Sequence, residues 1–149
     1  LLAYSGCHVV FFERNPVLQV LLSASIHALK SELPDMAQRI ALNRINSIEY
    51  LREALTNESI ELPMNCYMDP MYPHRKKSAL VKLDLRMVRD LVGDDPDSAE
   101  LLASAIALLK SDRGMKRVIV KRPAKSEFLG NIKPSYSIDA PNTRFDVYI

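Results

Sequence analysis

The sequence predicts an α/β fold in which helices cover a mostly parallel, doubly wound sheet that closes with an antiparallel C-terminal hairpin. Short apolar runs of strand-like composition alternate with longer segments whose apolar residues recur at helical spacing. The last two strand-like segments, residues 135–139 and 144–149, follow one another around a turn at Pro141 and Asn142. The 149 residues amount to one domain, which we expect to extend over residues 1–149.

The first strand and helix are predicted from residues 8–33. Residues 8–12 form an apolar run with β-branched and aromatic side chains, which is typical of a buried parallel strand. Charged and polar residues end this strand, and Pro16 suits the first turn of a helix. The apolar stripe of that helix, which reaches about Leu33, consists of Val17, Leu18, Val20, Leu21, Leu22, Ile26 and Leu29.

A second strand and helix follow. Residues 34–35 suit a short helical turn, and residues 39–45 alternate loosely between apolar and polar, as a strand does. Asn46 and Ser47 suit the cap of a helix whose apolar residues are Ile48, Leu51 and Leu55.

The second half continues the alternation. Apolar runs predict strands at residues 65–68 and 116–120. Apolar residues at helical spacing predict one helix from Ser78 to Gly93 and another from the Asp95–Ser98 segment through Lys110.

Composition and charge exclude several classes of protein. Hydrophobic residues make up 48% of the chain and charged residues 26%, as in ordinary globular proteins. The net charge of +2 excludes a polycation, so any attraction to nucleic acid must come from a local patch.

Cys7 and Cys66 lie in apolar runs and are expected to be buried free thiols. The three histidines are scattered, so we expect no metal site. No apolar run reaches membrane-spanning length, which makes the cytoplasm the default location and predicts no membrane partner.

The most informative segment is an acid-Pro-x-aromatic turn after the strand at residues 65–68. Here Asp69 and Pro70 are followed by Tyr72 and Pro73. The Asp69 carboxylate can accept a hydrogen bond from an exocyclic amino group, and the prolines stiffen the turn so that its carbonyls also point at the amine. Tyr72 offers a face on which a base can stack. The pattern is typical of enzymes that methylate amino groups, although Asp-Pro is also a common start of an ordinary turn.

Polar residues follow four predicted strands, at the edge where ligands bind in open parallel sheets. Glu13 suits a nucleotide-type cofactor, because a carboxylate directly after a strand can bind both ribose hydroxyls. Asn46 or Ser47 would suit contact with an adenine edge. These three residues also have ordinary structural roles near helix N-termini. The four groups are Glu13 and Arg14, Asn46 and Ser47, Asp69, and Lys121 and Arg122.

A cationic cluster follows the acid-Pro-x-aromatic turn. Such a run is usually a solvated face, but beside an amine-binding turn it favours contact with nucleic-acid phosphates, which dominate affinity. The predicted RNA-binding residues are His74, Arg75, Lys76, Lys77, Lys82, Lys121 and Arg122.

Five segments together resemble the RsmJ family of small-subunit ribosomal RNA (guanine-N2-)-methyltransferases, which use S-adenosylmethionine (SAM). The resemblance extends over nearly the whole chain and is strongest from Asp69 to Lys82. The segments are Phe12–Pro16, Asp69–His74, Lys77–Lys82, Lys116–Pro123 and Arg144–Tyr148.

This resemblance implies a Rossmann-like class I SAM-dependent methyltransferase fold, with an antiparallel last strand in a seven-stranded sheet. It implies SAM as the cofactor and 16S ribosomal RNA or a ribosomal particle as the partner. The family's first strand and Gly-rich SAM loop precede the point at which this sequence starts, and the chain begins with Leu1 rather than Met. We therefore expect residues 1–149 to be the C-terminal major part of a single methyltransferase domain. The implied cofactor contacts are Glu13, Arg14, Asn46, Ser47 and Asp69.

Three alternatives stay open at the level of the sequence. The acid-Pro-x-aromatic turn also suits methylation of amino groups in DNA or of a protein amide. Glu13 would suit an NAD ribose equally well, as in a nucleotide-binding oxidoreductase, but that function leaves the segment from Asp69 to Tyr72 unexplained. The basic run and Tyr72 also fit a non-catalytic RNA-binding module with a Rossmann-like fold.

Overall fold

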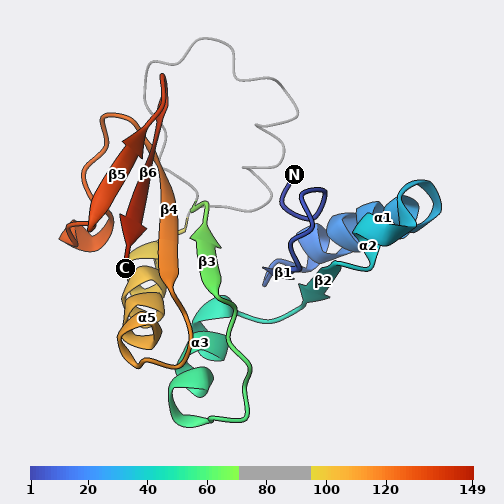
Figure 1. The fold of residues 1–149 in the computed structure, drawn as a ribbon, viewed down its shortest axis with the longest axis horizontal. Coiled ribbons are helices and arrows are strands. Elements are labelled where there is room, and N and C mark those ends of the chain that lie inside the picture. Colours follow the sequence, from blue (N-terminus) through green and yellow to red (C-terminus); the bar gives the residue numbers. More distant parts are fainter. Residues whose placement is uncertain (71–94) are drawn as a thin grey trace. The chain divides into compact units, whose positions relative to one another are not determined.

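Strands and helices alternate along most of the chain and two strands close it, as the sequence predicts (Figure 1). The computed structural model describes residues 1–70 and 95–149, and the helix predicted from Ser78 to Gly93 lies outside them. Residues 1–50 form one unit and residues 51–149 another, with one sheet in each. No helix in the described part of the chain is long and apolar enough to cross a membrane.

The first unit is built on two parallel strands, β1 (Val9–Phe12) and β2 (Ile40–Asn43). They are connected by α1 (Pro16–Glu32) and the short α2 (Pro34–Ala37), because a parallel pair needs a crossover and cannot be joined by a tight turn. Asn15 caps α1 as its side-chain oxygen accepts the first free N–H groups of the helix. The predicted strand-helix-strand order is confirmed here.

Two predictions about burial in this unit are wrong. Val10 and Phe11 of β1 are 45% and 41% exposed, and Cys7 is exposed as well. A two-stranded sheet has too little surface to enclose a strand on both faces, and α1 itself contains no fully buried residue. The apolar run therefore formed the predicted strand without the predicted burial.

The second unit contains a four-stranded sheet in the order β3-β4-β6-β5 (Figure 1). β3 (Asn65–Met68) and β4 (Arg117–Pro123) are parallel. β6 (Thr143–Tyr148) is antiparallel to β4 and to β5 (Tyr136–Asp139), the strand at the edge. The α/β class with parallel strands and a closing antiparallel hairpin is thus confirmed, and β3 has the predicted bounds.

The core of this unit lies on one face of its sheet. Alternation along β4 buries Val118 and Val120 completely, and α5 (Ser98–Lys110), which packs on β4, buries Leu102 and Leu108. Another helix, α3 (Ser47–Thr56), begins within the first unit and ends within the second.

β4 is longer than predicted. The sequence predicted an end at Val120, but the strand continues through Pro123. β3 stops opposite Val120, whereas β6 goes on pairing with β4, so that Lys121 lies opposite Phe145. The pairing with β6, on the side of β4 away from β3, therefore determines where β4 ends. Lys121 is part of the strand rather than of the loop after it.

Candidate functional site

Glu13 lies at the carboxyl end of β1, in the turn that leads into α1. Its N–H donates to the Asn43 carbonyl at 3.1 Å, and its Oε1 accepts the Asn15 N–H at 2.7 Å. The side chain of Gln19 donates to the Glu13 carbonyl at 2.8 Å. These bonds fix the turn and the carboxylate, while Oε2 accepts no hydrogen bond from the described residues. One oxygen of the half-buried carboxylate is therefore open to a ligand hydroxyl.

Asn46 begins α3 at the end of the neighbouring strand. Its Oδ1 accepts the Ile48 N–H at 2.9 Å, and its carbonyl accepts the Tyr50 N–H at 3.1 Å. The predicted cap of this helix is confirmed, and Ser47 is its first helical residue. Because Oδ1 is used in capping, the amide NH₂ of Asn46 is the part of this side chain that suits a ligand acceptor.

An aromatic contact joins the start of α3 to the end of β1. The Phe12 and Tyr50 rings have their centroids 4.5 Å apart and are tilted by 42°. Since Phe12 directly precedes Glu13, the predicted cofactor residues of the first unit gather at one edge of its sheet. Arg14, in the same turn, is exposed.

In the second unit, Asp69 and Lys121 form an ion pair. Nζ of Lys121 lies 2.6 Å from Oδ2 of Asp69, and the side chains are 38% and 48% exposed, respectively. The hydrogen bond that Lys121 donates to Asp69 raises the pKa of Lys121, so its ammonium group is charged at neutral pH. Pro70, which follows, is buried.

Tyr67 is a third member of this cluster and was not predicted from the sequence. Alternation along β3 places it on the same face as Asp69, and half of the residue is exposed. Burial and then the charge of Asp69 raise the pKa of the Tyr67 phenol, while Lys121 opposes them, so the phenol is neutral at ordinary pH. The i, i+2 spacing of Tyr67 and Asp69 in a predicted strand was the signal that could have found it.

Lys121 and Arg122 do not come together in one patch. Successive residues of β4 point to opposite faces, and the Arg122 Nη2 donates to the Glu127 carbonyl at 2.7 Å. Within residues 1–70 and 95–149, no group of three or more His, Cys, Asp or Glu could hold a metal ion. The predicted residues Tyr72, His74, Arg75, Lys76, Lys77 and Lys82 lie outside the described residues.

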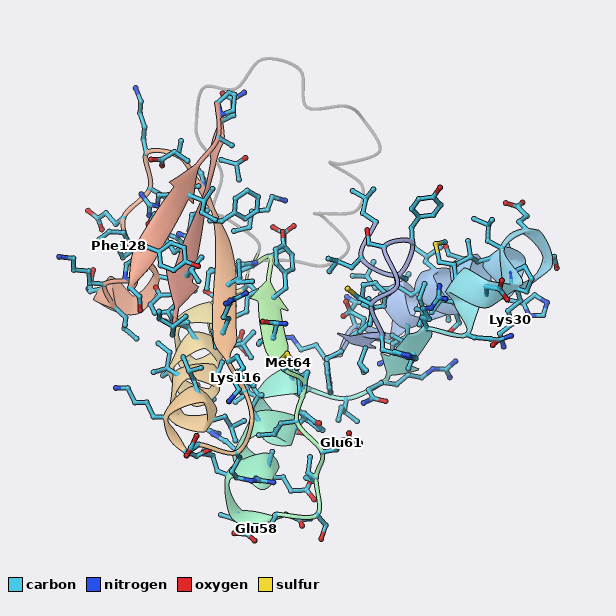
Figure 2. All side chains as sticks on the ribbon, viewed as in Figure 1. Lys30, Glu58, Glu61, Met64, Lys116 and Phe128 are labelled. Carbon is cyan, nitrogen blue, oxygen red and sulfur yellow. The ribbon has the colours of Figure 1, made fainter. Side chains whose placement is uncertain are left out.

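A buried ion pair in β6 has a structural role. Asp146 is completely buried, and Arg144 donates to its two carboxylate oxygens at 2.7 and 2.9 Å. Ser137 of β5 donates to Oδ1 at 2.6 Å, and the Arg144 guanidinium lies 4.8 Å from the centre of the Phe128 ring, which is labelled in Figure 2. Both oxygens of this buried carboxylate accept hydrogen bonds from these side chains, so the pair stabilises β6 and its contact with β5 rather than offering a ligand site.

The chain is similar to known proteins over nearly its whole length. Residues 1–149 match the family described as "Putative SAM-dependent methyltransferase". The chain is 43% identical to ribosomal RNA small subunit methyltransferase J of Thioalkalivibrio sulfidiphilus, over 99% of this chain and 56% of that protein. It is 42% identical to the protein of the same name from Photobacterium profundum, over 99% of this chain and 57% of that protein.

A solved structure is similar as well. The crystal structure of a SAM-dependent methyltransferase from Neisseria gonorrhoeae matches with a TM-score of 0.68 at 33% identity, over 99% of this chain and 55% of that one. The chain thus spans a little over half the length of the relatives it matches. The resemblance to the RsmJ family indicated by the five sequence segments is confirmed.

Proposed function

Because the chain belongs to the family of SAM-dependent methyltransferases, we propose that the protein transfers a methyl group from SAM to the N2 amino group of a guanine in 16S ribosomal RNA. The observation that carries this proposal is the oriented carboxylate of Asp69, directly after β3, at the head of the acid-Pro-x-aromatic turn. The names of the relatives support small-subunit ribosomal RNA as the substrate. The choice of guanine N2 rests on the resemblance to the RsmJ family.

SAM, when bound, supplies a methyl group activated by its positively charged sulfur: the S–CH₃ bond breaks as the bond to N2 forms, S-adenosylhomocysteine is left, and the nitrogen loses one proton to solvent. The open Oε2 of Glu13 fits a ribose hydroxyl, since the rest of the carboxylate is held by its own turn. The amide NH₂ of Asn46 fits an acceptor on the adenine edge. The residues assigned to the cofactor are Glu13, Arg14, Asn46, Ser47 and Asp69.

Guanine N2 is a poor nucleophile, because its lone pair is delocalised into the ring. Asp69 accepts one amino hydrogen and the Pro70 carbonyl the other, which favours a pyramidal nitrogen with a localised lone pair. Positioning and electrostatic stabilisation then supply most of the rate enhancement. Tyr72 stacks on the guanine, and the predicted RNA-binding residues other than Lys121 hold the backbone phosphates.

The direct test is methyl transfer by protein expressed from the complete reading frame. The protein is incubated with tritiated SAM and with 16S ribosomal RNA, either free or in small ribosomal subunits, and the RNA is digested to nucleosides. The proposal expects the label in N2-methylguanosine. Label in adenosine or cytidine, or preferential labelling of DNA or protein, would assign the site to a different acceptor amine. RNA binding without any methyl transfer would favour a non-catalytic RNA-binding module.

A further inference from the structure

The parallel register of β3 and β4 decides which side chains meet beyond the end of β3. Met68, the last residue of β3, lies opposite Val120, so the next residues, Asp69 and Lys121, are neighbours. Lys121 is still held in the sheet, because it pairs with Phe145 of β6, whereas Asp69 has already left its strand. The lysine therefore comes from the more constrained of the two segments.

The two oxygens of the Asp69 carboxylate have different surroundings. Oδ2 accepts the Lys121 ammonium at 2.6 Å, and Oδ1 accepts no hydrogen bond from the described residues. The ion pair restricts rotation of the carboxylate and so gives Oδ1 a defined direction. An acceptor that is oriented before the substrate arrives loses less free energy to reorganisation in the transition state.

The same pairing makes Lys121 a poor contact for RNA phosphate. A phosphate bound to its Nζ would bring negative charge beside the Asp69 carboxylate, at a side chain that is only 38% exposed. A lysine that has no neighbouring carboxylate is better suited to bind an RNA phosphate.

We propose that Lys121 is a positioning residue for methyl transfer, which holds Oδ2 of Asp69 so that Oδ1 meets the acceptor amine. This inference rests on the proposed function of Asp69. It replaces the expectation that Lys121 binds the RNA backbone.

Steady-state kinetics separate the two roles of Lys121. Lys121→Met is expected to lower kcat by about tenfold or more, while KM for RNA stays within about twofold, since the lost interaction orients the acceptor. Lys121→Arg should restore much of kcat, because a guanidinium can also donate to Oδ2.

The matched control is Lys116→Met, which removes the same charge just before β4. Figure 2 labels Lys116 beside Met64, whose carbonyl accepts the Lys116 N–H at 2.7 Å, at the end of the sheet opposite to Lys121. This variant should leave kcat unchanged. A raised KM for RNA in Lys121→Met, with unchanged kcat and a shallower salt dependence of RNA affinity, would identify a phosphate contact and overturn the inference.

A second measurement needs neither SAM nor RNA. ¹⁵N NMR of the lysine Nζ should show that the pKa of Lys121 falls in Asp69→Asn, because the hydrogen bond that Lys121 donates to the Asp69 carboxylate raises it in the wild type. An unchanged pKa would show that the pair does not form, which overturns the inference alone. Absence of methyl transfer by the wild-type protein would instead overturn the proposed function, and the inference with it.

Discussion

At the scale of single residues, the proposed function depends on the Asp69 carboxylate, one oxygen of which has a partner within the chain while the other is open. Lys121 binds Oδ2 of Asp69 at 2.6 Å, and Oδ1 is open to an amine N–H. An amino group offers two hydrogens, so one carboxylate oxygen and one backbone carbonyl are enough to bind both. Loss of the carboxylate would therefore remove the acceptor and leave the ammonium of Lys121 without its counter-charge.

Asp69→Ala is expected to lower kcat of methyl transfer by about a hundredfold or more, the scale of losing one preorganised polar contact. Radiolabel transfer to ribosomal RNA measures this. Glu58→Ala removes an exposed carboxylate from the loop after α3 and should leave kcat within about twofold of the wild type. Near-normal activity of Asp69→Ala would show that Asp69 is not the amine acceptor.

The two cysteines are expected to differ sharply in reactivity. Burial raises the pKa of the Cys66 thiol to about 11, whereas Cys7 is exposed. In Cys7→Ser at about pH 8, the remaining thiol should react with an aromatic disulfide about a hundredfold more slowly than an exposed thiol, because so little thiolate is present. Fast reaction should return in guanidinium chloride. Equal rates for both thiols in the folded protein would contradict the raised pKa of Cys66.

The same raised pKa gives a pH dependence of stability. The folded state holds the Cys66 proton more tightly than the unfolded state, so this stabilisation is complete below the unfolded pKa and is lost as pH rises towards about 11. Urea unfolding should therefore show a falling free energy of unfolding over that range, and the fall should be smaller in Cys66→Ala.

Local sequence was enough to find Asp69, because an acid followed by proline at the end of an apolar run is visible within a few residues. Lys121 was also noticed, but with RNA as its expected partner. Its contact with Asp69 joins residues 52 positions apart and depends on the register of β3 against β4. No pattern near Lys121 specifies that register, so only the structure identifies the pair.

At the scale of elements, the sequence specified the existence of strands better than their ends or their burial. β3 has the predicted bounds, and the closing hairpin forms as expected. β4 is longer than predicted because β6 extends its pairing, and Val10 and Phe11 of β1 are exposed because their sheet has only two strands. Both differences are caused by neighbouring elements. The apolar pattern of a strand gives no information about which elements will pair with it or cover it.

The cap of α3 provides a test of an element-scale contribution. Asn46→Ala removes the hydrogen bond to the Ile48 N–H and should lower the free energy of unfolding by about 1 kcal/mol. Urea denaturation measures this, with Gln38→Ala, an exposed polar side chain, as the control. A loss of SAM affinity without a loss of stability in Asn46→Ala would mean that the side chain serves the cofactor alone.

The ion pair between Arg144 and Asp146 in β6 should contribute more to the free energy of unfolding than the cap of α3 does. Asp146→Ala leaves Arg144 without its partner in a buried site and is expected to cost about 3–5 kcal/mol of the free energy of unfolding. Replacing both residues, with Arg144→Met and Asp146→Leu, should recover much of that loss, because no buried charge then stays unpaired. A single Asp146→Ala variant as stable as the wild type in urea would contradict this role.

At the scale of the whole molecule, the chain combines features of two kinds of binding. Glu13 and Asn46 present polar groups suited to a nucleoside at the strand ends of the first unit, and in the second unit Asp69, held by Lys121, is proposed to accept the amine. The net charge of +2 gives little overall attraction to RNA. The proposed binding to ribosomal RNA must therefore depend on local cations such as the predicted cluster from His74 to Lys77.

The most direct measurement is calorimetric titration of SAM into protein expressed from the complete reading frame, with NAD as the control ligand. The proposed function predicts SAM binding at micromolar concentrations, no comparable binding of NAD, and loss of SAM binding in Glu13→Ala, because the ribose hydroxyls lose their acceptor. Binding of NAD in place of SAM, or no binding of SAM at all, would contradict it.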